Sequence, residues 1–134
     1  SANDAARALS IHVAGSKTAF IDLMNKKAKN LGMNATKYYS DHGLIVDENS
    51  FMDVSTPYDI AILALACLNN PNTLKYTGKE LIYLGNRKFM CSTRNTLIKK
   101  IGGYEGCDGL KTGFTKRAGF NLVASAKRNN KRIR

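Results

Sequence analysis

The hydrophobic pattern of this chain changes along its length, and the order of the change limits the folds it can adopt. Over residues 5–14 and 20–31, apolar side chains lie on one face of a helical repeat, and a glycine follows each run. Residues 58–68 form a third, largely apolar run after a Ser-Thr-Pro helix start. Residues 109–114 and 118–126 predict strands instead. Helices that come first and antiparallel strands that come last predict an α+β fold.

Shorter signals predict the remaining elements. Asn, Asp and Ser side chains can cap helices, and Gly-Asn-Arg between two short runs predicts a small hairpin. In chain order, these features are caps at Asn3 or Asp4 and at Ser16, a long ordered loop over residues 33–54, a helical turn at 72–76, hairpin strands at 79–84 and 88–91, an Asn-Asn turn at 129–130, and a short last strand at 132–134. We expect the sheet to be incomplete at the end of the chain.

Positive charge is the unusual bulk property of the chain. Lys and Arg number 21 against 10 Asp and Glu, which gives a net charge of +11 and favours anionic partners. Residues 127–134 hold five basic residues, which form either an electrostatic arm or an edge hairpin kept soluble by charge. No aromatic residue lies among them to stack on a base, so we favour the hairpin and expect no nucleic-acid partner.

The cysteines give no sign of a metal centre. Cys67, Cys91 and Cys107 are 24 and 16 positions apart and form no CxxC pair, so we expect no zinc or other metal site. Cys67 lies in an apolar helical run and is expected in the core. No run approaches the ~20 apolar residues that a membrane-spanning helix needs.

Two tripeptides carry the functional signal. Ser-Ala-Asn at residues 1–3 opens the first helix, and Lys-Thr-Gly at residues 111–113 lies on the first C-terminal strand. Each is weak alone, but their order, separation and placement are specific. The chain resembles the D-alanyl-D-alanine carboxypeptidases, the low-molecular-mass penicillin-binding proteins, whose signature comprises SxxK, S-x-N and K-T-G. The resemblance is carried by residues 1–6, 23–28, 31–33, 42–44, 55–59, 94–95, 108–115, 118–120 and 123–128.

One part of that signature is absent from the chain. No serine is followed by a lysine three positions later; Ser10, for example, is followed by Val13. The family's nucleophile and its partner lysine belong to SxxK, upstream of S-x-N. We therefore expect a fragment of a penicillin-binding, transpeptidase-like catalytic domain, inactive alone, with a helical lobe at about residues 1–101 and sheet strands at about residues 107–134.

The resemblance implies acyl transfer without a metal or organic cofactor. A serine attacks the carbonyl between two terminal D-alanines, one alanine leaves, and water clears the acyl-enzyme. Ser1 is implied to relay a proton to the leaving amine, and the Asn3 amide to contact the substrate backbone. The implied partners are peptidoglycan stem peptides that end in D-Ala-D-Ala, β-lactam antibiotics and the missing segments of the domain. The implied location is the bacterial cell envelope, periplasmic or extracytoplasmic, with the full-length protein membrane-associated.

The resemblance also gives roles to residues of the K-T-G strand. Lys111 is implied to hold positive charge near the substrate carboxylate, and Thr112 to donate a hydrogen bond to it. Gly113 has no side chain, so a peptide or β-lactam can lie along the strand edge. The Phe114 N–H is implied as one of two oxyanion donors. Arg94 either helps to hold the carboxylate or bridges loops beside the sheet.

Three other functions compete with this interpretation. A serine β-lactamase shares the K-T-G strand, but no glutamate here has an asparagine four residues later to activate deacylating water. An N-terminal nucleophile would use Ser1, yet that architecture expects a strand where this sequence predicts a helix. A basic anion-binding module would rest on the net charge. Outside the motifs, we expect His42 to be structural, His12 to lie at the surface and Tyr58 to pack within its helix.

Overall fold

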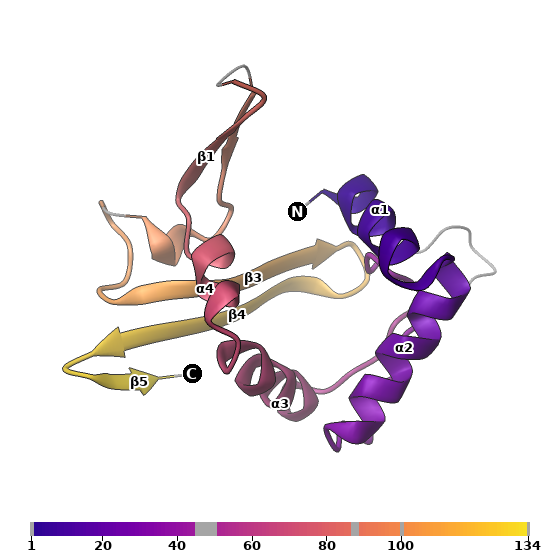
Figure 1. Cartoon of the computed structure of the whole chain (residues 1–134). Coiled ribbons are helices and arrows are strands. Elements are labelled where there is room, and N and C mark those ends of the chain that lie inside the picture. The colour runs from indigo at the N-terminus through magenta and orange to yellow at the C-terminus, as the bar shows by residue number, and fades with distance from the viewer. Residues whose placement is uncertain (1, 45–50, 87–88, 100, 134) are drawn as a thin grey trace. The chain divides into compact units, whose positions relative to one another are not determined.

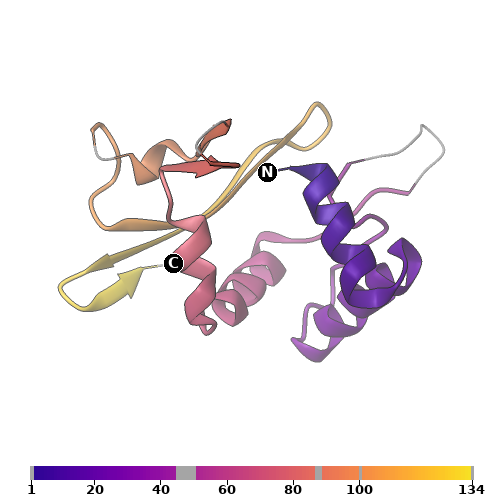
Figure 2. The ribbon, with the colours of Figure 1, turned by 45° about the horizontal axis from the view of Figure 1, so that its top comes forward.

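The computed structural model describes residues 2–44, 51–86, 89–99 and 101–133. The chain forms two compact units, Ser1–Leu63 and Ala64–Arg134, and the division falls within the third helix. Figure 1 labels the elements, and Figure 2 shows them from a second direction. Within the described residues, helices come first and antiparallel strands last, which confirms the α+β fold.

Helices α1 (Asn3–Ala14) and α2 (Lys17–Asn30) pack against each other in the first unit (Figure 1). Gly15, at φ 77°, ends α1 in the left-handed conformation that favours glycine. Ser16 caps α2 as predicted, because its hydroxyl accepts a 3.1 Å hydrogen bond from the N–H of Ala19.

The cap predicted for α1 is wrong. The helix already begins at Asn3, because the carbonyl of Ala2 accepts the first helical hydrogen bond, from the N–H of Ala6 at 3.1 Å. Ala2 therefore stands at the N-cap, where its methyl group cannot accept a backbone hydrogen bond. Asn3 and Asp4 are residues of the first turn, where the Asp4 carboxylate accepts a 2.9 Å hydrogen bond from the N–H of Ala5.

The loop predicted between the second and third helices is confirmed over its described residues; residues 45–50 lie outside them. An isolated antiparallel bridge joins Lys37 to Val54. The Asn25 side chain of α2 donates to the carbonyl of Tyr38 and accepts from its N–H, both at 2.9 Å. These bonds order the loop against α2.

Helix α3 (Pro57–Leu68) begins at the predicted proline, but the expectation that Tyr58 packs is wrong. Tyr58 is 75% exposed, whereas Asp59 is buried. The Asp59 carboxylate accepts hydrogen bonds from the N–H of Ala35 at 2.9 Å and the hydroxyl of Thr36 at 2.7 Å. These bonds turn Asp59 inward, and Tyr58, about 100° away around the helix, faces outward.

The second unit continues with α4 (Pro71–Thr77) and the predicted small hairpin, β1 (Leu81–Leu84) and β2 (Phe89–Ser92). A short 3₁₀ helix, η1 (Thr96–Ile98), follows. Cys67, expected in the core, is half-buried at the end of α3. No helix among the described residues is long and apolar enough to cross a membrane.

A three-stranded antiparallel sheet ends the second unit, in the order β3 (Cys107–Thr115), β4 (Gly119–Arg128) and β5 (Lys131–Ile133). Figures 1 and 2 show β5 and β3 on opposite sides of β4. Asn129 and Asn130 form the turn before β5, at φ 45° and 61°. Four of the five basic C-terminal residues therefore lie on a hairpin, as we expected, and Arg134 lies outside the described residues. Strand β3 is an edge of the described sheet.

Candidate functional site

The K-T-G motif lies in the middle of β3, on the edge of the described sheet. Lys111, Thr112 and Gly113 pair across to Val123, Leu122 and Asn121 of β4. No other described strand pairs with β3. Among the described residues, the opposite edge of β3 therefore carries no paired strand, and an edge of this kind can pair with an extended backbone.

Gly113 has room for a side chain within the described unit. A Cβ atom built there would meet only the Cβ of Asn121, at 3.9 Å, which is an ordinary contact. Gly109, two residues before Lys111, is different, because its Cβ would lie 2.9 Å from the hydroxyl of Thr77. Packing against α4 therefore accounts for Gly109, whereas packing within the unit does not account for Gly113.

The surroundings of Lys111 lower the pKa of its ammonium group. Partial burial lowers the pKa of Lys111 below its ordinary value, and the positive charge of Arg94 lowers it further. The Lys111 ammonium donates a hydrogen bond to the carbonyl of Thr112. The positive charges of Lys111 and Arg94 repel each other, so an anion such as a carboxylate bound beside them would stabilise both.

Asn95 is a site residue that the sequence analysis missed. Asn95 is 3% exposed, and its side-chain amide donates to the carbonyl of Gly109 at 3.3 Å. Its side-chain oxygen accepts from the N–H of Leu97 at 3.1 Å and so caps η1. Asn95 therefore ties the segment that carries Arg94 to the strand that carries Lys111. An asparagine before the short apolar run at residues 96–98 is a capping signal, and it could have indicated this local role.

Asp108 anchors the start of β3 across the sheet. Both of its carboxylate oxygens accept hydrogen bonds from Arg132 of β5, at 2.8 and 2.7 Å. The hydroxyl of Ser125 on β4 donates to the same carboxylate at 2.7 Å. Arg132 is one of the five basic residues of the C-terminal segment, and its charge is paired with Asp108. Arg128 lies 4.3 Å from the ring centroid of Tyr104, a contact between residues far apart in the sequence.

The S-x-N motif lies at the start of the first unit. Asn3 is exposed in the first turn of α1, and Ser1 lies outside the described residues. Asn3 belongs to the first unit, and Lys111 and Arg94 belong to the second. His12 is exposed, which confirms the expectation of a surface residue. No group of three or more His, Cys, Asp and Glu side chains suited to a metal ion occurs within the described residues.

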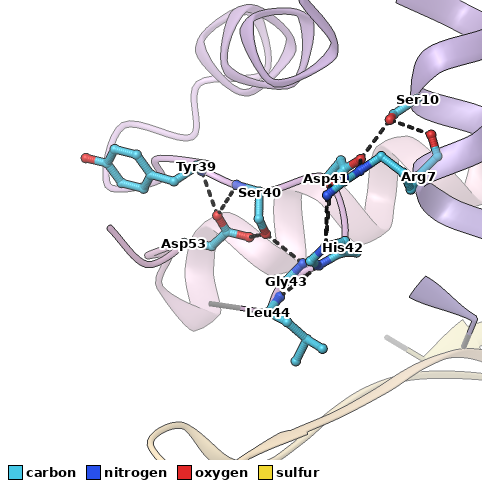
Figure 3. A network of polar contacts seen from close by, with 9 residues as sticks. All are labelled: Arg7, Ser10, Tyr39, Ser40, Asp41, His42, Gly43, Leu44 and Asp53. Atoms are coloured by element: carbon cyan, nitrogen blue, oxygen red, sulfur yellow. Dashed lines mark hydrogen bonds and ion pairs between the residues drawn. The ribbon is translucent and has the colours of Figure 1, made fainter. Parts of the chain in front are cut away.

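A polar cluster joins α1 to the loop that follows α2 (Figure 3). We call Arg7, Ser10 and Asp41 the Asp41 cluster. Arg7 donates to the two carboxylate oxygens of Asp41, from Nε at 2.5 Å and Nη2 at 2.9 Å, and Ser10 Oγ donates at 2.7 Å. The hydrogen bond from Arg7 lowers the pKa of Asp41 well below its ordinary range, although burial raises it. His42 Nε2 lies 3.1 Å from Arg7 Nη2, and its Nδ1 accepts from the N–H of Leu44 at 3.2 Å.

Comparison with protein families gives a match over the whole chain. The model of the Peptidase S11 family, described as D-alanyl-D-alanine carboxypeptidase, matches residues 1–134. D-alanyl-D-alanine carboxypeptidase DacF of Bacillus subtilis is 40% identical over 135 residues, which cover 98% of this chain and 33% of the relative. DacC of Escherichia coli is 38% identical over 133 residues, 99% of this chain and 32% of the relative. The chain thus spans about a third of the length of these curated relatives.

Solved structures with similar folds include penicillin-binding proteins. Penicillin-binding protein 6B from Escherichia coli has a TM-score of 0.83 and 32% identity, over 97% of this chain and 39% of the other. Penicillin-binding protein D2 from Listeria monocytogenes, in an ampicillin-bound form, has a TM-score of 0.82 and 37% identity. That match covers 98% of this chain and 51% of the other.

Proposed function

The chain belongs to the D-alanyl-D-alanine carboxypeptidase family, and from that premise we propose that it is the part of a serine-type D-Ala-D-Ala carboxypeptidase that carries the S-x-N and K-T-G motifs. The substrate is a peptidoglycan stem peptide that ends in D-Ala-D-Ala. β-Lactams acylate the same enzyme, in keeping with the ampicillin-bound form of the Listeria relative. The observation that carries the proposal is an intact K-T-G motif on an edge strand, in a chain that matches this family over its whole length.

The nucleophile of this enzyme lies in a segment outside the 134 residues. No serine of the chain has a lysine three positions later, and the curated relatives are about three times as long. In the proposed catalytic domain, residues 1–101 belong mainly to the helical lobe and residues 107–134 to the sheet. The whole enzyme works in the bacterial cell envelope.

The substrate lies along the free edge of β3 as an added strand. Its terminal carboxylate faces Lys111 and Arg94, whose mutual repulsion the carboxylate relieves, and Thr112 donates a hydrogen bond to it. Gly113 leaves space for the ligand backbone, which fits the finding that packing within the unit does not account for this glycine. The Phe114 N–H donates to the oxyanion of the tetrahedral intermediate, and a donor of this kind is worth about 2.7–4 kcal/mol.

The S-x-N motif acts on the scissile bond and on the peptide backbone. The Ser1 hydroxyl relays a proton from the SxxK lysine to the leaving amine. The Asn3 amide holds the substrate backbone, because an amide offers both a donor and an acceptor without a charge to desolvate. The acyl-enzyme formed with a β-lactam is released slowly, since no glutamate with an asparagine four residues later is present to activate water.

Labelling with a fluorescent penicillin tests this proposal. The 134-residue chain alone should form no covalent adduct, whereas a form extended upstream through its SxxK segment should be labelled on the SxxK serine. Intact-mass and peptide mass spectrometry locate the adduct, and the SxxK Ser→Ala variant is the matched control. A stoichiometric adduct on Ser1 or another serine of the chain would overturn the proposal in favour of a different nucleophile. Rapid turnover of the penicillin would instead indicate a β-lactamase.

A further inference from the structure

The Asp41 carboxylate has no exposed surface and is directed at one face of α1 (Figure 3). Ser10, which donates to it, is also fully buried, whereas the Arg7 side chain is 34% exposed. Two bonds come from Arg7 and one from the Ser10 hydroxyl, whose single proton also lies within reach of the carbonyl of Arg7, at 2.8 Å. Three donors on α1 thus converge on a single side chain of the loop. Convergent bonds of this kind restrict both the rotation of a helix about its axis and its movement along that axis.

The loop that carries Asp41 is itself held on the side away from α1. Asp53 accepts hydrogen bonds from the N–H groups of Tyr39 and Ser40, at 2.6 and 2.8 Å, and from the Ser40 hydroxyl at 2.8 Å. The Ser40 hydroxyl in turn accepts from the N–H of Gly43 at 2.7 Å. The backbone before Asp41 is therefore bonded to the Asp53 carboxylate, and the backbone after it is bonded to the Ser40 hydroxyl. These bonds restrict the position from which the Asp41 side chain extends.

The helical repeat places Asn3 on the face that Asp41 holds. Asn3, Arg7 and Ser10 are four and three residues apart, so they lie within an arc of about 60° around α1. Asn3 stands about 6 Å along the axis from Arg7 toward the N-terminus. The N-cap residue, Ala2, makes no side-chain hydrogen bond, and the Asp4 carboxylate, which accepts from the N–H of Ala5 at 2.9 Å, lies about 100° from Asn3 around the helix. Within the described first unit, the Asp41 cluster is then the nearest polar anchor on the Asn3 face.

We infer that Asp41 is a positioning residue for the S-x-N motif: through Arg7 and Ser10 it sets the rotation and axial position of α1, and thereby the direction of the Asn3 amide. This inference rests on the proposed function, in which Asn3 holds the substrate backbone. Because Arg7 keeps Asp41 ionised, the cluster holds α1 throughout the neutral pH range.

A double-mutant cycle tests the inference in the enzyme extended through its SxxK segment. The variants are Asn3→Ala, Asp41→Asn and the double variant, and the measured quantity is the rate of acylation by a fluorescent penicillin. Asp41→Asn keeps one acceptor oxygen and replaces the other by an amide N–H₂ that faces a donor, so at least one hydrogen bond of the cluster is lost. We expect each single change to lower the acylation rate about tenfold. The double variant should be little slower than either single variant, because an Asn3 amide that is already displaced no longer contacts the substrate and its removal has no further effect.

Asp59→Asn is the matched control, because Asp59 is also a buried carboxylate of the first unit but bonds to Ala35 and Thr36 instead of α1. It should lower the melting temperature, and its effect on the acylation rate should multiply with that of Asn3→Ala. All rates are measured at a temperature where circular dichroism shows each variant folded. If Asp41→Asn does not fold, Ser10→Ala removes one bond of the cluster and should give the same non-additivity at smaller size.

Two other outcomes separate the inference from the function it rests on. Fully multiplicative effects of Asn3→Ala and Asp41→Asn in folded protein would overturn the positioning role and leave the role of Asn3 intact. An unchanged rate in Asn3→Ala alone would instead overturn the role of Asn3 in the proposed function, and the positioning role with it.

Discussion

Replacing Arg7 by methionine should destabilise the first unit by an amount that depends on pH. Methionine keeps most of the apolar stem of arginine but removes both charged hydrogen bonds to Asp41. Two such bonds are worth about 3–6 kcal/mol if fully buried. The Arg7 side chain is 34% exposed, so water reaches the site and screens the Asp41 charge that the substitution leaves unpaired, and we expect a loss of about 2–4 kcal/mol near pH 7.

The sign of the pH dependence follows from the Asp41 carboxyl. The pKa of Asp41 in the folded chain is depressed. Its contribution to the free energy of unfolding is therefore complete above the pKa of about 3.9 that an aspartate has in the unfolded chain, and it is lost as the pH falls toward the pKa in the folded chain. In Arg7→Met, burial is no longer opposed by the guanidinium, and the pKa of Asp41 rises. At neutral pH, the buried and unpaired charge of Asp41 then destabilises the folded variant, and protonation of Asp41 removes this destabilisation. The stability difference between the two proteins should therefore narrow as the pH falls from 7 to 4.

Urea unfolding followed by circular dichroism at pH 7, 5.5 and 4 measures this difference. Arg132→Met is a matched comparison, because Arg132 also pairs with a carboxylate, Asp108, but that carboxylate side chain is 30% exposed, whereas Asp41 has no exposed surface. It should cost about 1 kcal/mol or less, with little change over this pH range. A loss below 1 kcal/mol for Arg7→Met at pH 7, or a difference that widens on acidification, would refute the reasoning.

Three further outcomes follow from the K-T-G strand and its sheet. In the extended enzyme, Lys111→Ala should lower the acylation rate roughly 10- to 100-fold, the equivalent of one charged hydrogen bond, without a change in melting temperature; an unchanged rate would contradict its role. Arg94→Gln should move the alkaline limb of the acylation pH profile upward, because Arg94 lowers the pKa of Lys111, and a downward shift would exclude this coupling. The 134 residues alone should be marginally stable or associate, because Phe120 and Leu122 are 89% and 48% exposed on the sheet. Calorimetry and light scattering test this, and a monomer with sharp melting at high temperature would contradict it.

Elements whose signals lie within a few residues could be predicted from the sequence. The Ser16 cap, the glycine after α1 and the Asn129-Asn130 turn are each local, since the side chain or backbone conformation involved acts on its immediate neighbours. The K-T-G strand and its α+β context were predictable for the same reason. Lys111 and the residues after it needed only a strand and a recognisable motif.

The errors lie where a local signal competes with packing. Asn3 has the chemistry of a cap but lies inside the helix, because α1 begins two residues before its apolar run. Tyr58 is apolar enough to pack, yet Asp59 beside it is turned inward by its bonds to the neighbouring loop. Which face of a helix is covered depends on segments that approach from elsewhere in the chain.

Only the tertiary structure decided which charges are paired. Arg7 and Asp41 are 34 positions apart, and Asp108 and Arg132 are 24 apart, so nothing in the local sequence couples them. The composition counts all four as charges that contribute to the net +11, whereas the folded chain uses them to hold α1 and β3. The sequence thus determined the chemical groups of the site and the elements that carry them. Their orientation depends on the path of the intervening loops, because hydrogen bonds a few ångströms long form only where folding brings distant backbone together.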